Sequence, residues 1–305
     1  MGIVINQSIK NSLSFYFGMF LGAISTVFVY PNVFNDQPDH WGLIQLIVAY
    51  SFIISTFSNF GVPKTFIRFF PIIENKSKFY FFSFLLITIG YLLFLILALF
   101  FEDWFFKFIS ASPLLIDKFY LIYFMVLIIS VYELFVSISR SNLNSTLPTF
   151  LNEAFLKSYS LIVLILHGLK ILNFDQFLFF YVGGYSMKLI IIFISQINTK
   201  SINLIFSLRG IKIIELIQFG LFVIVGGASA MLVSRLDMVM IGKFMGLKHV
   251  AFYSVAFYVG NAIRVPGRAV VAISAPIVSK AWKNNDLKLI KDCLLYTSPS
   301  PRDSS

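Results

Sequence analysis

Apolar residues gather along this chain into stretches of about 20 residues, which short polar connections separate. Because the hydrocarbon core of a bilayer is about 30 Å thick, a helix needs about 20 mostly apolar residues to cross it. The pattern therefore predicts about eight transmembrane helices. They fall at residues 12–30, 41–61, 79–101, 119–139, 154–172, 177–197, 213–234 and 250–278.

The composition supports a membrane protein and excludes two other classes. Of the 305 residues, 58% are hydrophobic and only 12% are charged, whereas soluble domains carry about 25% charged residues. A disordered chain is excluded as well, because 37 Phe and 14 Tyr are too much apolar surface to leave in water. The predicted fold class is an all-α integral membrane protein, with a complete six-helix lobe and the start of a second.

The formal net charge of +10 gives an orientation. In a soluble protein such a charge would suggest nucleic acid, but membrane proteins collect Lys and Arg in their cytoplasmic loops. Placing the N-terminus inside puts most of these residues on the cytoplasmic side, notably between residues 64 and 78 and between 280 and 291. We therefore predict a cytoplasmic N-terminus and no nucleic-acid partner. The loop after the seventh stretch fits least well.

The domain organisation follows from the connections. Residues 1–197 form the predicted N-terminal six-helix lobe, and residues 198–212 form a cytoplasmic linker whose apolar and basic residues predict an amphipathic interfacial helix. Residues 213–292 then supply the first two helices of a C-terminal lobe, which we expect to be truncated. Residues 293–305 change abruptly in composition, with Ser, Pro, Arg and Asp in place of Ile, Phe and Lys, and resemble an adapter-derived ending. A genuine disordered tail is the alternative.

Several ionisable side chains fall inside the predicted spans, where each costs at least about 2.5–3.5 kcal/mol at a helix centre. They are Lys188, Glu133 and Arg264 with Arg268, and Arg235 with Asp237 closes the seventh span. One interpretation is that the cations line a water-filled cavity and meet an anionic substrate, such as a diphosphate. The other is that they pair internally, for example Lys188 or Arg264 with Glu133. Basic residues outnumber acidic ones, which favours the first interpretation.

The remaining candidate chemistry is sparse. Arg68, which follows the second span, joins the candidate cations, and Glu133 and Asp237 are candidate charge partners or coupling residues. The three histidines lie far apart without metal-ligand spacing, and the single cysteine allows no internal disulfide, so we expect no metal and no cofactor. Gly18 and Gly22 would let the first helix approach a neighbour closely.

The seventh and eighth stretches resemble a known family. Residues 234–242, SRLDMVMIG, followed by Gly246 and by residues 250–256, VAFYSVA, are similar to the pattern around the seventh and eighth helices of bacterial polysaccharide flippases. Ala275-Pro276 with Ser279 resembles the family's ending of the eighth helix. The resemblance covers residues 1–292 and indicates the superfamily of multidrug, oligosaccharidyl-lipid and polysaccharide exporters.

The resemblance implies two six-helix lobes around a central cavity that opens alternately to each side of the bacterial inner membrane. It also implies a substrate, an oligosaccharide linked to polyprenyl diphosphate, as in O-antigen and lipopolysaccharide synthesis, and no catalysis. A proton or sodium ion is left open as a coupling ion. The sequence departs from the family pattern in length, since helices nine onward are missing.

Two other functions compete with this interpretation. A cation-coupled drug exporter of the same superfamily would need an acidic residue inside the N-terminal lobe, and only Glu133 lies well inside a predicted span. A polysaccharide-processing membrane enzyme would place acid-base residues in a large outer loop. The longest outer loop, about residues 102–118, holds Glu102, Asp103 and Asp117 but no histidine.

Overall fold

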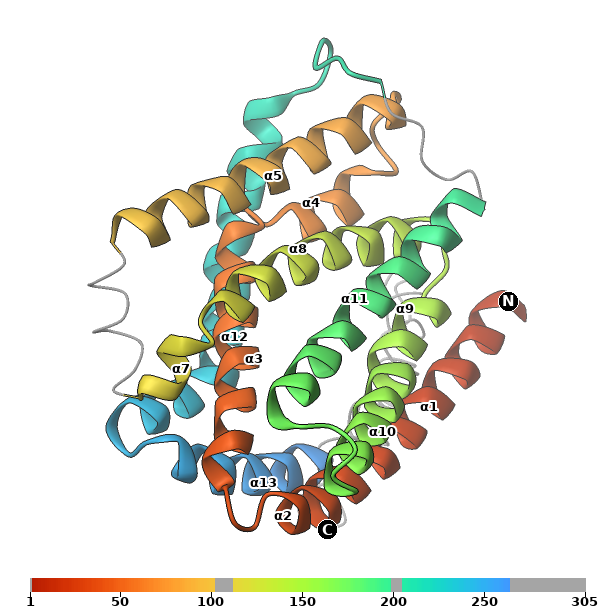
Figure 1. Ribbon diagram of the computed structural model, residues 1–305. Coiled ribbons are helices and arrows are strands. Elements are labelled where there is room, and N and C mark those ends of the chain that lie inside the picture. The colour runs from red at the N-terminus through yellow and green to blue at the C-terminus, as the bar shows by residue number, and fades with distance from the viewer. Residues whose placement is uncertain (1, 102–111, 199–204, 264–305) are drawn as a thin grey trace, which may run out of the picture.

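The computed structural model describes residues 2–101, 112–198 and 205–263, and these residues are all helical or irregular, without strands (Figure 1). The helices are α1 (Gly2–Ala23), η1 (Ile24–Val29), α2 (Tyr30–Val33), α3 (Pro38–Ser58), α4 (Val62–Phe69), α5 (Lys76–Phe100), α7 (Pro113–Asp117), α8 (Tyr120–Ser141), α9 (Thr146–Phe150), η2 (Leu151–Phe155), α10 (Leu156–Gly168), α11 (Phe174–Asn198), α12 (Ile213–Phe244) and α13 (Leu247–Ile263). Segments η1 and η2 are π-helices.

The predicted fold class, an all-α multi-pass membrane protein, is confirmed. Six helical segments are long and apolar enough to cross a bilayer, and the bent helix α12 makes a seventh if its two halves form one span. The six are Ile9–Val33, Pro38–Ser58, Lys76–Phe100, Tyr120–Ser141, Thr146–Gly168 and Phe174–Asn198. Of the predicted eighth span, the structure describes the part up to Ile263, while Arg264, Arg268 and the tail from 293 to 305 lie outside the described residues.

Two of the predicted span boundaries were wrong, and in both places a π-helix lies within the span. The first span continues through Pro31 to Val33 instead of ending at Tyr30, and the wide turns of η1 directly precede the proline, with the Tyr30 amide donating to the Ser25 carbonyl. The fifth span begins at Thr146, not at residue 154. Pro148 is tolerated there because first-turn amides need no helical partner.

Helix α12 also runs further than its sequence pattern predicted. It continues past Ser234 to Phe244 and ends where Gly246 adopts a φ of +90°. Its two parts, Ile213–Gly227 and Met231–Phe244, meet at an angle of 52°, next to the glycine pair at 226 and 227. Arg235 and Asp237 therefore lie within a helix instead of closing it.

Contacts at the two ends of the bundle agree with the predicted up-and-down order. At one end, the Gln7 Nε2 amide donates to the Leu143 carbonyl, and Lys78 Nζ donates to the Arg209 carbonyl at 2.8 Å. At the other end, Lys118 pairs with Asp175 at 2.9 Å and with Asp117 at 3.0 Å. These carboxylates raise the pKa of Lys118 above its ordinary value. Which end faces the cytoplasm stays a prediction.

The linker differs from its prediction. Residues 205–212 are not helical in the structure, and residues 199–204 lie outside its described part. Gly210 has a φ of +84°, which interrupts a helix, and the Ile205 amide donates to the Ser77 carbonyl beside the start of α5. The segment is therefore held at the start of α5 by this backbone bond and by the Lys78 side chain, and it forms no amphipathic helix over residues 205–212.

Helix α3 contacts helices from both the middle and the later part of the described chain. One of its faces packs on α8 and another on α12 and α13, and α3 and α8 are the two most buried spans (Figure 1). Glycines permit the close approach on the second side, because a Cβ atom at Gly42 would collide with the Leu247 carbonyl of α13. Near the other end of α3, Gly61 lies equally close to the Gly220 carbonyl of α12. Helix α3 is thus held along its length against both following helices.

Candidate functional site

Three cavities follow one another along α3, from its C-terminal end to its N-terminal end. The first, of about 460 Å³, lies between α3, α4, α8 and α12. The second, of about 290 Å³, lies between the first span, α3, α10, α11, α12 and α13. The third, of about 410 Å³, lies where α2 and the start of α3 meet α13. Residues of α3 line all three, at positions 52, 55, 56 and 59, then 41 and 45, then 38 and 41.

The first cavity combines apolar walls with charges of both signs. Lys64 and Arg140 line it as exposed cations, and the partly buried Glu133 of α8 contributes its carboxylate. Lys64 lies at the bend of α12, where a Cβ atom at Gly227 would be 3.1 Å from its Nζ. Asn59 Oδ1 is buried in the cavity wall and has no hydrogen-bond partner within the described residues. This cavity can therefore offer polar contacts beside an apolar surface.

The second cavity is cationic. Arg235 of α12 and Lys157 of α10 both line it, and its lining within the described residues includes no Asp or Glu. Uncharged polar side chains complete the wall, among them Gln45, Tyr258 and Asn261. Lys157 lies at the middle of the span Thr146–Gly168, far from either membrane surface. Two cations at this depth are a strong attraction for an anionic group.

Side chains that include aromatic rings lie between neighbouring cavities. The Arg235 guanidinium lies over the Phe52 ring, 5.4 Å from its centroid. Phe52 lines the first cavity and Arg235 the second, so this cation-π pair stands between them. Tyr30 and Trp41 line both the second and the third cavity, with their rings stacked at 3.4 Å between centroids. The cavities thus form a row divided by two aromatic partitions.

Lys188 lies behind this row rather than in it. Its side chain is 3% exposed, and its Nζ donates to Asn152 Oδ1 at 3.0 Å. The ammonium also lies over the rings of Tyr132, at 4.1 Å, and Tyr185, at 4.8 Å. Glu133 is close enough to act on it electrostatically. Lys188 lines none of the three cavities.

The other predicted residues are dispersed. Arg68 is exposed on α4, with its guanidinium 4.8 Å from the Phe219 ring centroid, outside the three cavities. Asp237 is exposed and accepts a hydrogen bond of 2.9 Å from the Tyr253 hydroxyl. Arg264 and Arg268 lie outside the described residues. Of the predicted cations, the structure therefore brings Arg235 alone into a described cavity.

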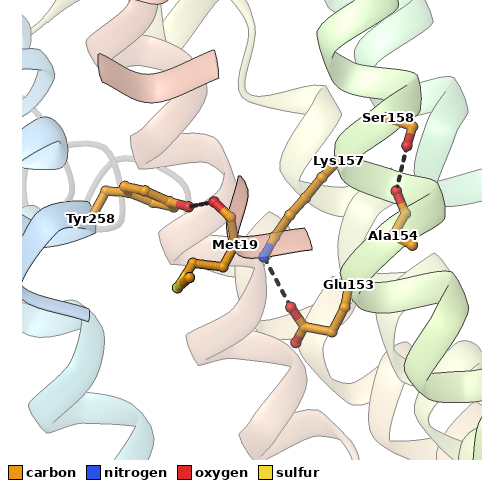
Figure 2. A network of polar contacts seen from close by, with 6 residues as sticks. All are labelled: Met19, Glu153, Ala154, Lys157, Ser158 and Tyr258. Carbon is orange, nitrogen blue, oxygen red and sulfur yellow. Dashed lines mark hydrogen bonds and ion pairs between the residues drawn. The ribbon is translucent and has the colours of Figure 1, made fainter. Parts of the chain in front are cut away.

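Lys157 was not among the predicted site residues, because the predicted span 154–172 placed it near the cytoplasmic end of the fifth helix. The ammonium of Lys157 forms an ion pair of 2.9 Å with Glu153, one helical turn earlier (Figure 2). Because the fifth span begins at Thr146, Glu153 lies inside it and Lys157 lies at its middle. The spacing of four residues between opposite charges was a visible sign of this pair. The misplaced span boundary hid it.

A hydrogen bond beside the second cavity connects α1 to α13. The Tyr258 hydroxyl donates to the Met19 carbonyl at 2.6 Å, as Figure 2 shows. A Cβ atom at Gly22 would collide with the Tyr258 ring, and one at Gly18 would collide with the Glu153 carbonyl. Gly18 therefore allows the close approach of η2, and Gly22, one turn further on, that of α13. Among the described residues, no group of three or more His, Cys, Asp or Glu could hold a metal ion.

Together, the spans and the row of cavities define an all-helical, multi-pass membrane protein with a polar, partly cationic interior. A family model described as "Polysaccharide biosynthesis protein" matches residues 7–282. The chain belongs to this family, which covers the polysaccharide flippases that the seventh and eighth helices resembled. Among curated proteins and among solved structures, no significant match was found.

Proposed function

We propose that this protein carries an oligosaccharide linked to polyprenyl diphosphate across the bacterial inner membrane, for the synthesis of a surface polysaccharide of the O-antigen or lipopolysaccharide kind. The observation that carries the proposal is the second cavity, where Arg235 and Lys157 face a shared space deep in the helical bundle. Membership of a polysaccharide biosynthesis family supports it.

In this proposal the two cations divide the recognition of the diphosphate. The planar guanidinium of Arg235 can bind two phosphate oxygens at once, while the Lys157 ammonium acts as a point charge on a long side chain. Gln45 and Asn261, which line the same cavity, can bond to the sugar or to the remaining phosphate oxygens. No bond is made or broken, so the protein acts as a transporter and not as an enzyme.

In this proposal the row of cavities is the path of the substrate, and the predicted orientation gives its direction. With a cytoplasmic N-terminus, the first cavity lies toward the cytoplasm and the third toward the outside. The substrate would enter beside Lys64 and Arg140, pass Arg235 and leave beyond Tyr30 and Trp41. Alternating opening of the two partitions would keep the membrane sealed during passage. Labelling of a cysteine at position 75 from the outside would contradict this orientation.

Lys188 and Glu133 lie next to the second cavity without lining it, and in this proposal they hold its wall in place. Lys188 holds Asn152, which precedes Glu153 in η2, and Glu133 lines the first cavity next to it. This arrangement favours internal pairing for Lys188 rather than contact with substrate. Arg264 and Arg268 remain candidate substrate cations, and Asp237 remains a candidate coupling residue.

A cation-coupled drug exporter is the second candidate. It is favoured by one observation, the carboxylate of Glu133 in the apolar first cavity. Such a protein would bind cationic drugs at Glu133 and would depend little on Arg235. Lys64 and Arg140 in the same cavity work against it, since they repel cationic drugs.

The test is complementation of a bacterium that lacks its own flippase, with the complete protein and its variants. Arg235→Gln and Lys157→Met should each lower surface polysaccharide about tenfold or more, because a charged hydrogen bond contributes about 1.5–3 kcal/mol. Lys212→Gln, which removes an exposed cation from the linker end, is the matched control. Full activity in both cavity variants would contradict the proposal, and drug resistance without polysaccharide would favour the exporter.

A further inference from the structure

The ion pair between Glu153 and Lys157 is unusual for its depth. The side chains are 26% and 32% exposed, and the pair lies at the middle of its span. Either charge alone would be costly there, so each stabilises the other. Lys157 lines the second cavity, whereas Glu153 is not among the lining residues. The cavity therefore contains a cation that already has a partner.

The two members of the pair differ in how firmly they are held. Glu153 belongs to the π-helix η2, and its backbone packs directly on Gly18 of α1. Its neighbour Asn152 is bound by Lys188. The ammonium of Lys157, in contrast, is carried on a flexible four-carbon chain. Lys157 is thus the partner that can turn toward a ligand while Glu153 stays in place.

Arg235 provides the comparison within the same cavity. It forms no salt bridge with a carboxylate among the described residues, and its guanidinium lies over Phe52 instead. An entering anion would meet Arg235 without displacing any carboxylate. To reach Lys157, the anion must compete with Glu153.

We propose that Glu153 is a counter-ion that competes with the diphosphate for Lys157 and so limits how tightly the second cavity holds its substrate. This inference rests on the proposed function. A transporter needs a site that binds strongly enough to admit the substrate and weakly enough to release it. Glu153 weakens the binding of the diphosphate, because its carboxylate pairs with the Lys157 ammonium again when the diphosphate leaves. Glu153 acts through Lys157 and does not touch the substrate.

The experiment measures binding of farnesyl diphosphate, a short polyprenyl diphosphate, to the complete protein in nanodiscs. The proteins compared are the wild type, Glu153→Gln, Lys157→Met, the double variant, and Glu215→Gln. Glu215 pairs with Lys212 at 3.7 Å on the exposed start of α12, so its variant removes the same group from an ion pair outside the cavity. Farnesyl monophosphate and inorganic pyrophosphate separate the contribution of the second phosphate from that of the lipid chain.

We expect Glu153→Gln to bind farnesyl diphosphate about fivefold more tightly than the wild type, because the competing pair is worth about 1 kcal/mol. The gain should disappear in the double variant, which should bind as weakly as Lys157→Met alone. Transport by Glu153→Gln should be slower despite the tighter binding. Glu215→Gln should bind like the wild type.

Three results would overturn the inference. If Glu153→Gln binds no more tightly than the wild type, Glu153 does not compete. If the gain persists without Lys157, Glu153 acts by another route. In both cases the wild type still binds the diphosphate, and the proposed function stands. Absence of binding by every protein, the wild type included, would contradict the proposed function and the inference with it.

Discussion

Substitution of Lys188 by methionine separates a supporting role from contact with the substrate. The change keeps an unbranched side chain of similar length but removes the charge. It deletes the 3.0 Å hydrogen bond to Asn152 and the cation-π contacts to Tyr132 and Tyr185. Because Lys188 is only 3% exposed, these contacts lie in the interior of the bundle, where a lost hydrogen bond is costly.

The expected change in the free energy of unfolding is the difference between opposing contributions. A hydrogen bond to a charged group contributes about 1.5–3 kcal/mol, and each buried cation-π contact contributes about 0.5–2 kcal/mol. The released cost of burying an ammonium group, several kcal/mol, offsets most of this gain. Asn152 is left without its donor, and Glu133 loses the nearby positive charge. We expect a net loss of about 1–2 kcal/mol in the free energy of unfolding.

The assay is thermal unfolding of the complete protein in nanodiscs, together with surface polysaccharide in cells. A domain of this size loses about 2–4 °C in Tm for each kcal/mol. Asn152→Ala should reproduce both the lowered Tm and a moderate loss of transport, since it breaks the same bond from the other side. Unchanged stability of Lys188→Met, with transport abolished and Asn152→Ala fully active, would refute this reasoning and place Lys188 on the substrate.

Three further predictions concern a close backbone contact, a hydrogen bond between helices and an ion pair at one end of the bundle. Gly61→Ala should destabilise the protein by about 1–3 kcal/mol, because Gly61 has a φ of +68° and its Cβ would meet the Gly220 carbonyl; an unchanged Tm would contradict this. Tyr258→Phe should lower the free energy of unfolding by about 1 kcal/mol and should lower the yield of cross-links between α1 and α13. An unaltered cross-link yield would show that the hydroxyl does not hold these helices together. Lys118→Met should cost less than about 1 kcal/mol, and the loss should shrink in high salt, since its carboxylate partners are exposed.

The sequence was sufficient to predict the helical class and the order of the spans, because lipid thickness and apolar run length are local properties. The described residues contain six spans, or seven with the bent α12, against about eight predicted. It failed where the backbone departs from a regular α-helix. The π-helix η2 and Pro148 hide the start of the fifth span, so Lys157 was placed near the cytoplasmic end of that span and not at its middle. Similarly, Arg235 was placed at a helix end, although α12 bends and continues to Phe244. The sequence thus named Arg235 as a candidate but missed Lys157, which shares its cavity.

The identity of the site depended on tertiary packing that no local pattern contains. Lys188, inside a predicted span, and Arg235, at the end of one, were both predicted to be substrate cations, and no local pattern separates their roles. The structure places Lys188 between two tyrosine rings and Asn152, while Arg235 lines a cavity. Only the position of the neighbouring helices decides which cation is enclosed and which is accessible.

The most direct test of the central claim is transport by the purified complete protein in liposomes that contain an oligosaccharide linked to polyprenyl diphosphate. A glycosidase that cannot cross the membrane, added outside, reports the sugars that reach the outer leaflet. We predict rapid cleavage of the protected fraction with the wild type and with Lys212→Gln, and a rate at least about tenfold lower when Arg235 and Lys157 are both replaced by uncharged residues. Transport by the double variant at the wild-type rate would contradict the claim that the second cavity carries the diphosphate.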